Sequence, residues 1–266
     1  MNTIIEVRNL SKHFGDLKAV DGISFTVGEG EFFSFLGPNG AGKSTTIKML
    51  ITLLRPTGGV ASIDGYDIVR QASLIRKNIG YVPQLISVDG SLTAYENLML
   101  MARLFDIPAK ERNQRISETL SFLKLEKQAN TLVKNFSGGM IRKLEIGQSI
   151  IHKPKVLFLD EPTSGLDPVA RRDVWTHLLE LRDKYNTAIF FATHDMEEAD
   201  EMSDRVAIIN KGKIEIIGTT EELKQKTDNP AANLEDAFIF FSGNSLQENG
   251  NFRDIARGRR TAKRLG

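Results

Sequence analysis

Residues 37–45, with the sequence GPNGAGKST, have the composition of a loop that holds phosphate. Gly37, Gly42, Lys43 and Ser44 fit the spacing G-x-x-x-x-G-K-[ST], in which backbone N–H groups of the loop point at phosphate oxygens. Lys43 would reach the β- and γ-phosphates of a nucleotide, and Ser44 would place its hydroxyl on Mg²⁺. The alternative is a helix cap with an exposed lysine.

The segments on either side of this loop favour the phosphate site. EFFSFL, at residues 31–36, has the pattern of a strand, and KSTTIKMLITLL, at residues 43–54, has helical spacing. A phosphate loop requires this order of strand, loop and helix. We therefore predict a nucleotide-binding loop that comprises Gly37, Pro38, Asn39, Gly40, Ala41, Gly42, Lys43, Ser44 and Thr45.

Two carboxylates follow a second apolar segment, VLFL at residues 156–159. Asp160 would lie at the carboxyl end of a buried strand, where a phosphate-loop protein holds its magnesium. Mg²⁺ keeps most of its waters, so Ser44 and Asp160 suffice as protein ligands. Glu161 would orient or deprotonate the attacking water as a general base. Its alternative role is that of a structural acid in a charged cleft.

A second glycine-rich turn, FSGGMIRKLE at residues 136–145, also leads into a helical pattern. Ser137 is placed to cap that helix, whose positive N-terminal end favours an anion. A phosphate held by residues 37–45 does not need a second cradle from the same chain. The turn is therefore either a plain helix cap or the site of a second anion.

The composition of the chain argues against several classes of function. The 266 residues include 35 Lys and Arg against 34 Asp and Glu, so the net charge of +1 gives no global nucleic-acid footprint. Because the chain has no cysteine, disulfides, thiolate metal sites and a cysteine nucleophile are excluded. The N-terminus lacks the pattern of a signal peptide, and no run approaches the roughly 18 to 20 apolar residues of a membrane span.

The elements that must position these residues alternate along the chain. Residues 4–36 read as strands, residues 92–151 carry helical patterns, and buried-type strands at residues 155–160 and 187–193 flank a helix over 168–185. This order predicts an α/β fold with a three-layer phosphate-loop core and a mostly parallel sheet. An antiparallel β element near the N-terminus and a helical insert at about 92–151 complete the predicted domain, residues 1–218.

Residues 219–266 form a predicted C-terminal extension. Leu234, Ala237, Phe238 and Phe241 lie at i, i+3, i+4 and i+7, which predicts an amphipathic helix over 234–241 that packs on the core. From Gly243 onward the chain is polar and ends in RDIARGRRTAKRLG. We expect this basic tail to be solvated and disordered; contact with anionic lipid or an acidic partner is the alternative.

From about residue 4 to 218 these motifs resemble, in order, those of the ATP-binding subunit of an ABC transporter. By this resemblance GPNGAGKST is the phosphate loop, FSGGM the family signature, and LFLDEP the strand that carries the metal ligand. His194 would be the γ-phosphate switch, and Gln84 of YVPQ would be a metal ligand that joins the helical insert to the metal. The other residues that the resemblance assigns to nucleotide are Phe14, which stacks on adenine, together with Ser137, Gly138, Gly139 and Asp167.

The signature departs from the family pattern. It usually reads Leu-Ser-Gly-Gly-Gln, whereas Phe136 and Met140 occupy its first and last positions in this chain. Activity is expected to survive because Ser137, Gly138 and Gly139, which supply the phosphate contacts, are kept. The segments SGGMIRKLEI, DEPTSGLDP and LEDAF resemble exporters of the drug-resistance type.

The resemblance implies hydrolysis of ATP with Mg²⁺ in a nucleotide-dependent homodimer, or in a pair with a homologous ATPase subunit. Two ATP molecules would be buried between head-to-tail chains, each covered by the other chain's signature. A separate membrane-spanning permease would be driven near Gln84. The chain is accordingly expected in the cytoplasm, peripheral on the inner face of the cell membrane through that permease.

Two alternatives belong to other classes. Soluble ABC-type ATPases that act on nucleic acid or ribosomes usually carry two such domains or long coiled-coil insertions, and neither occurs in this sequence. A GTP switch protein would need Asn-Lys-x-Asp, whereas NKGK at residues 210–213 lacks the aspartate. We therefore expect no nucleic-acid partner.

Overall fold

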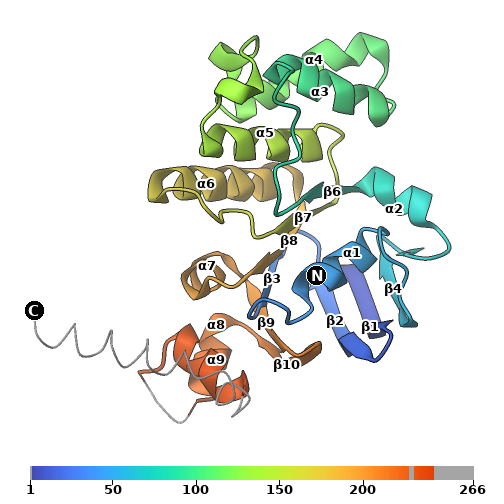
Figure 1. Ribbon diagram of the computed structural model, residues 1–266, viewed down its shortest axis with the longest axis vertical. Helices are drawn as coiled ribbons and strands as arrows, with labels where there is room; N and C mark the ends of the chain where they lie inside the picture. The colour runs from blue at the N-terminus through green and yellow to red at the C-terminus, as the bar shows by residue number, and fades with distance from the viewer. Residues whose placement is uncertain (1, 228–230, 243–266) are drawn as a thin grey trace, which may run out of the picture.

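Two β-sheets organise the computed structural model of the chain, which describes residues 2–227 and 231–242 (Figure 1). The first sheet is antiparallel, and its strand order is β2-β1-β4-β5. Buried and exposed side chains alternate through much of its strands, as expected for a sheet with one face on the core. Its strands are β1 (Thr3–Phe14), β2 (Leu17–Gly28), β4 (Gly58–Ile63) and β5 (Tyr66–Asp67).

The second sheet has the order β10-β9-β3-β8-β7-β6 and is parallel except at β10, which pairs antiparallel with β9. Its strands are β3 (Phe32–Leu36), β6 (Ile79–Val82), β7 (Val156–Asp160), β8 (Ala188–Thr193), β9 (Arg205–Asn210) and β10 (Lys213–Gly218). The central strands β3, β7 and β8 are buried throughout, because both faces of the sheet are covered.

The two faces of the second sheet build two different cores. Phe158 and Phe190 point into a core shared with the first sheet, where Phe190 also packs against Phe33 with ring centroids 5.7 Å apart. Leu157 and Phe191, on the opposite face, belong to the core formed with the helices. An apolar strand thus contributes side chains to both cores, because successive side chains point to opposite faces of the sheet.

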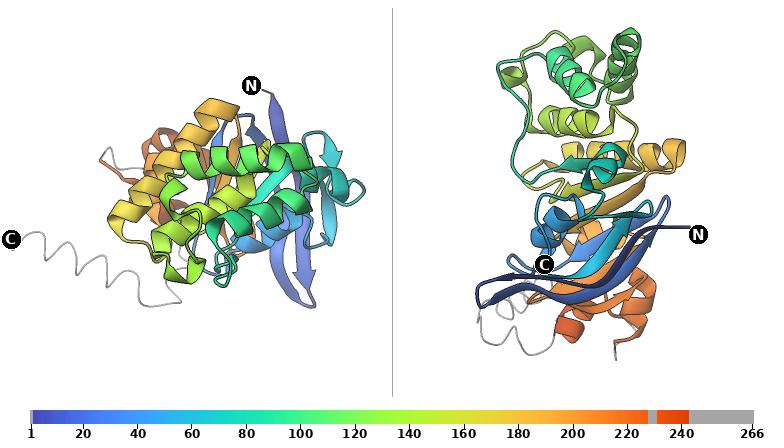
Figure 2. Two further views of the ribbon diagram at one scale, coloured as in Figure 1. Left: turned by 90° about the horizontal axis from the view of Figure 1, so that it is seen from above. Right: turned by 90° about the vertical axis from the view of Figure 1, so that its right-hand side faces the viewer.

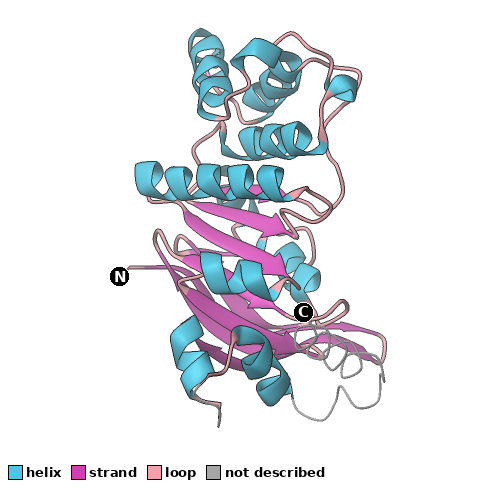
Figure 3. Cartoon of the chain, turned by 90° about the vertical axis from the view of Figure 1, so that its left-hand side faces the viewer, coloured by secondary structure: helices cyan, strands magenta, loops and turns pink. Residues whose placement is uncertain are grey.

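The helices form the outer layers and a separate helical part. The strands lie between helical layers (Figure 3), and the helical part stands at the opposite end of the molecule from the first sheet (Figure 2). That part holds α3 (Ala94–Leu104), α4 (Ala109–Phe122) and α5 (Gly138–Ile150). The other helices are α1 (Lys43–Leu50), α2 (Ala72–Asn78), α6 (Pro168–Tyr185), α7 (Met196–Met202), α8 (Thr220–Gln225) and α9 (Leu234–Ser242).

This architecture confirms the predicted α/β class, with an antiparallel β element at the N-terminus and helices between the strands. Leu234, Ala237 and Phe238 of α9 are buried in a third core with residues of β9 and α7. The basic tail from Gly243 onward lies outside the described residues.

Helix α8 was not predicted, although the sequence carries a local signal for it. Thr219 accepts a hydrogen bond from the N–H of Glu222, and the Glu222 carboxylate accepts one from the N–H of Thr219. This reciprocal pair is a capping box, and its pattern T-x-x-E is visible in the sequence.

No helix within residues 2–227 and 231–242 is both long enough and apolar enough to span a membrane.

Candidate active site

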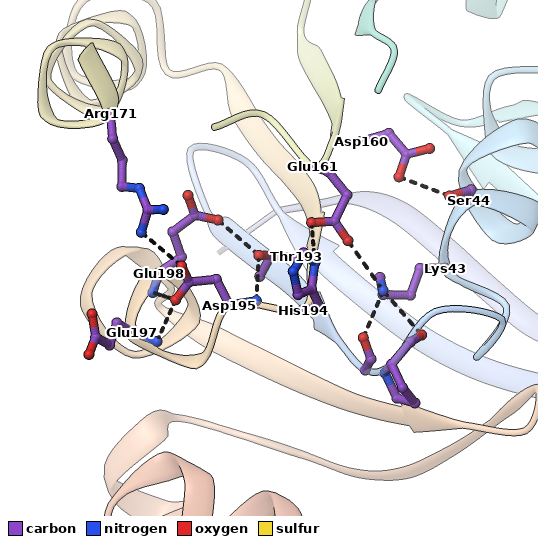
Figure 4. Close-up of polar contacts among 12 residues, drawn as sticks. Lys43, Ser44, Asp160, Glu161, Arg171, Thr193, His194, Asp195, Glu197 and Glu198 are labelled. Carbon is purple, nitrogen blue, oxygen red and sulfur yellow. Dashed lines mark hydrogen bonds and ion pairs between the residues drawn. The ribbon is translucent and has the colours of Figure 1, made fainter. Parts of the chain in front are cut away.

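One edge of the second sheet collects most of the predicted site residues. Four neighbouring parallel strands, in the order β3-β8-β7-β6, all end at this edge. β3 leads into the glycine loop, β8 leads to His194, β7 ends at Asp160 and continues to Glu161, and β6 leads to Gln84. The carboxyl ends of parallel strands are the usual place for a ligand site in such a fold (Figure 4).

The glycine loop wraps around the end of Lys43. Its Nζ donates hydrogen bonds to the carbonyl oxygens of Gly37 and Pro38 at 2.7 and 3.2 Å, and the side chain is buried. Gly42 has φ +106, and a Cβ there would lie 2.6 Å from the Ala19 carbonyl oxygen, so only glycine fits. Helix α1 begins at Lys43, and its first-turn N–H groups have no intrahelical acceptor, which suits an anion at this end.

Ser44 and Asp160 lie together as a metal site requires. The Ser44 hydroxyl donates a hydrogen bond to Asp160 Oδ1 at 2.9 Å. Burial raises the pKa of Asp160 and the charge of Glu161 adds to this, while the bond from Ser44 and the nearby lysines oppose it. Within the described ranges no three His, Cys, Asp or Glu residues gather to hold a metal alone. Two hard oxygen ligands supplemented by phosphate and water fit Mg²⁺.

Glu161 is the most constrained carboxylate of the site. It has φ +53, which is unusual for a residue with a side chain, and its N–H donates to the Ala192 carbonyl at 2.9 Å. Glu161 Oε1 lies 3.3 Å from Lys43 Nζ, and Oε2 lies 2.8 Å from His194 Nδ1. Glu161 is buried, whereas the His194 side chain is 56% exposed. The structure thus joins the lysine, the predicted base and the predicted switch in one chain of contacts.

Phe14 lies at the end of β1, opposite Leu17 across the β1–β2 hairpin. Its side chain is half exposed rather than packed in the core, and Lys12 Nζ lies 5.0 Å from the ring centroid. The next residues of β2 run beside the glycine loop, as the contact between Ala19 and Gly42 shows. The ring is therefore available to a planar group bound near the loop.

The second glycine turn lies elsewhere. Ser137 accepts a hydrogen bond from the Met140 N–H at 3.3 Å and caps α5, which belongs to the helical part rather than to the sheet edge (Figure 1). A Cβ on Gly139 would lie 2.8 Å from Ala170 Cβ, so this glycine permits close approach of α5 to α6. The residues Ser137, Gly138 and Gly139 are thus not brought to the site formed by Lys43, Asp160 and Glu161.

Two further predicted residues lie in loops, Gln84 after β6 and Asp167 directly before α6. Gln84 is exposed, and its carbonyl accepts a hydrogen bond from Arg142 Nη2 at 3.3 Å. Asp167 caps α6, since its Oδ1 accepts hydrogen bonds from the N–H groups of Val169 and Ala170, both at 2.9 Å. Within the chain these contacts fix the two loops in place.

A buried ion pair behind Gln84 was not predicted. Arg142 and Glu145 of α5 contact each other at 2.9 Å and are both buried. Arg142 donates to the Pro83 carbonyl at 2.8 Å, and Glu145 accepts from the N–H of Ser87 at 2.6 Å. The helix thereby holds both ends of the loop that carries Gln84. The sequence offers only opposite charges at i and i+3, which normally indicate a solvated helix face.

Comparison with protein families gives a match to the family described as "ABC transporter" over residues 20–164. The daunorubicin/doxorubicin resistance ATP-binding protein DrrA of Streptomyces peucetius is 43% identical over 83% of this chain and 66% of its own length. The Nod factor export ATP-binding protein I of Burkholderia lata is 43% identical over 79% of this chain and 68% of its own. The chain spans only 41% of the probable multidrug ABC transporter ATP-binding protein YbhF of Escherichia coli, at 38% identity.

Solved structures agree with these sequence matches. An ATP-binding subunit of an ABC transporter superposes with a TM-score of 0.80 and 29% identity, and the match covers 90% of this chain and all of that one. A dimeric ATP-binding cassette in a post-hydrolysis state, bound to ADP and Pi, superposes with a TM-score of 0.72 and 27% identity over 81% of this chain and 98% of its own.

Proposed function

The chain belongs to the ABC transporter family, and we propose that it is the ATP-hydrolysing subunit of an exporter. It would bind Mg-ATP, hydrolyse it, and use the resulting opening and closing of a dimer to drive a separate membrane-spanning permease. The relatives described above are named for drug resistance, multidrug transport or export. These names favour an exporter over a soluble ATPase that acts on nucleic acid or ribosomes.

The observation that carries the proposal is the meeting of Lys43, Glu161 and His194 beside the Ser44–Asp160 pair. Lys43 would leave the carbonyls of Gly37 and Pro38 and bind phosphate oxygens instead, because an anion is the stronger partner for an ammonium group. That exchange would release Glu161 from Lys43. The carboxylate would then be free to accept a proton from the attacking water.

His194 has a complementary role in the proposed site. Its ring is largely exposed and its Nδ1 already contacts Glu161. The imidazole would stabilise the γ-phosphate while Glu161 orients the water. Ser44, Asp160 and Gln84 would hold Mg²⁺, whose charge neutralises the phosphate oxygens. The remaining loop residues, with Phe14, would bind the nucleotide.

The second glycine turn supports a dimer. Because Ser137, Gly138 and Gly139 lie away from Lys43 in the same chain, we propose that they cover ATP held by a second chain, where Asp167 would also contact it. Two copies arranged head to tail would bury two ATP molecules. We further propose that residues 1–218 form the ATPase domain, that 219–266 form an extension, and that the permease holds the dimer at the inner face of the cell membrane.

Phosphate release from Mg-ATP tests the proposed activity. The purified chain should release phosphate at a rate that saturates with ATP, and removal of Mg²⁺ by a chelator should reduce that rate to background. Added Mg²⁺ should restore it, because the metal that Ser44 and Asp160 would hold supplies the positive charge that neutralises the phosphates. Phosphate release that is equally fast in the chelator would refute the site.

Phe14 can be tested in the same assay. Stacking of a base on an aromatic ring is worth about 1 to 3 kcal/mol, so Phe14→Ala should raise the KM for ATP about ten- to a hundredfold with little change in kcat. Phe14→Tyr should stay close to the parent because the ring is kept. Equal KM values in all three proteins would remove Phe14 from the nucleotide site.

A further inference from the structure

The residues on both sides of His194 are anchored to the neighbouring helices. Thr193, which precedes it, donates a hydrogen bond from its hydroxyl to Glu198 Oε2 at 2.8 Å and accepts one from the Asp195 N–H at 3.0 Å. Asp195, which follows it, caps α7 with Oδ1 and accepts a bond from Arg171 of α6 at 2.8 Å through Oδ2. Figure 4 shows these side chains beside His194, on the side away from Lys43.

Glu198 is the centre of this arrangement. It is buried, and Trp175 of α6 donates an indole N–H to its Oε1 at 3.4 Å. Burial raises the pKa of Glu198, and the bond from Thr193 opposes this. A buried carboxylate is costly unless both of its oxygens are satisfied, and Thr193 and Trp175 each donate to one oxygen of Glu198.

His194 is exposed and depends on this anchoring. With 56% of its side chain exposed, the imidazole has few packing contacts to fix it, yet its Nδ1 must lie within hydrogen-bond reach of Glu161. Its position therefore depends on the backbone of residues 193–195. That backbone is fixed by Glu198 through Thr193 and by Arg171 through Asp195.

We propose that Glu198 is a positioning residue for ATP hydrolysis, which acts by holding the Thr193–Asp195 turn so that His194 meets Glu161 and the γ-phosphate. The proposal rests on the ATPase function inferred above. The Glu198 side chain is hydrogen-bonded to Thr193 and Trp175 and is not part of the proposed nucleotide site. Removal of the Glu198 side chain should lower the rate of the chemical step. ATP binding should be nearly unchanged, because the phosphate loop follows β3 and Glu198 does not contact it.

The test compares steady-state phosphate release by four proteins: the parent, Glu198→Ala, Glu198→Gln and Glu197→Ala. Glu198→Ala should lower kcat about tenfold or more and change the KM for ATP by less than about twofold. Glu198→Gln should recover most of kcat, since the amide can still bond Thr193 and fill the same space. Glu197→Ala is the matched control, because Glu197 is exposed on the same helix and its side chain points away from the turn (Figure 4).

A double variant separates positioning from general damage. If Glu198 acts through His194, the loss in His194→Ala/Glu198→Ala should equal that in His194→Ala alone within about twofold. Losses that multiply would overturn the proposal. Trp175 is the only tryptophan of the chain and is buried, so an unchanged emission maximum verifies that its packing between α6 and α7 is preserved.

The remaining outcomes each support or overturn the role of Glu198. If Glu198→Ala does not fold, Thr193→Val removes the same hydrogen bond together with the one from the Asp195 N–H, so it should lower kcat about tenfold or more; parent kcat in that variant would overturn the proposal. A parent that releases phosphate while Glu198→Ala matches Glu197→Ala refutes the role of Glu198 alone. A parent without any turnover refutes the ATPase function, and the role of Glu198 with it.

Discussion

Replacement of Lys43 by alanine should abolish hydrolysis of Mg-ATP and weaken ATP binding. Lys43 Nζ is buried against the loop carbonyls and Glu161, so it is already placed where the phosphates would enter. A preorganised charge of this kind is worth far more in a site closed to water than in solution. We expect kcat to fall by at least about a hundredfold, measured as phosphate release at saturating ATP.

A matched control separates loss of the site from loss of a charge. Lys77→Ala removes an exposed lysine from the short surface helix α2 and should keep the parent rate. Lys43→Met, which keeps most of the side-chain volume, should be as inactive as Lys43→Ala, because only the charge is missing. Turnover at the parent rate in either Lys43 variant would remove the phosphate-loop assignment.

Glu161→Gln should produce a different defect. The amide keeps the shape of the side chain and leaves Lys43, Ser44 and Asp160 in place, but it cannot accept a proton from water. Turnover should fall about a hundredfold or more while ATP stays bound. Since ATP binds the dimer in preference to separate chains, the variant should elute as a dimer from a sizing column in Mg-ATP and as a monomer without it.

The control for this prediction is another glutamate changed in the same way. Glu180→Gln alters an exposed side chain of α6 and should turn over at the parent rate without a persistent dimer. A Glu161→Gln protein that hydrolyses ATP like the parent would place the base elsewhere. The left-handed backbone at Glu161 is not disturbed, because glutamine and glutamate have the same Cβ.

The sequence was sufficient to predict the strands and the loop that position the site residues. The strands before the glycine loop and before Asp160 are buried throughout, as their mainly apolar sequences predicted. The neighbouring order of β3, β8 and β7 brings Lys43, Asp160 and His194 to one edge, as a parallel sheet requires. The motifs around Lys43 and Asp160 predicted that these two residues belong to one site, and the family resemblance added His194.

Interactions between distant helices could not be predicted in the same way. Glu198 follows Glu197 in an acidic run, EEADE, and nothing in the sequence shows that one glutamate is buried against Trp175 while the other is exposed. The pair Arg142 and Glu145 is equally ambiguous, since its burial depends on the loop that carries Gln84. Tertiary packing decides the environment of such residues.

The proposed arrangement, in which each ATP site forms between two chains, takes Lys43 from one chain and Ser137 from the other. Its most direct test is ATP occlusion in mixed dimers, with Glu161→Gln in every chain to stop turnover. One mixture pairs a Lys43→Ala chain with a Ser137→Arg chain. The other pairs a chain that carries both changes with a chain that carries neither.

Shared sites predict occlusion in the first mixture, because the two damaged halves fall in one site and the second site is intact. In the second mixture each shared site has one damaged half, so mixed dimers should occlude no ATP. Sites formed within one chain predict the reverse. Retained nucleotide, measured on dimers isolated through different tags on the two chains, should therefore appear in the first mixture only; occlusion in the second mixture alone would contradict the head-to-tail dimer.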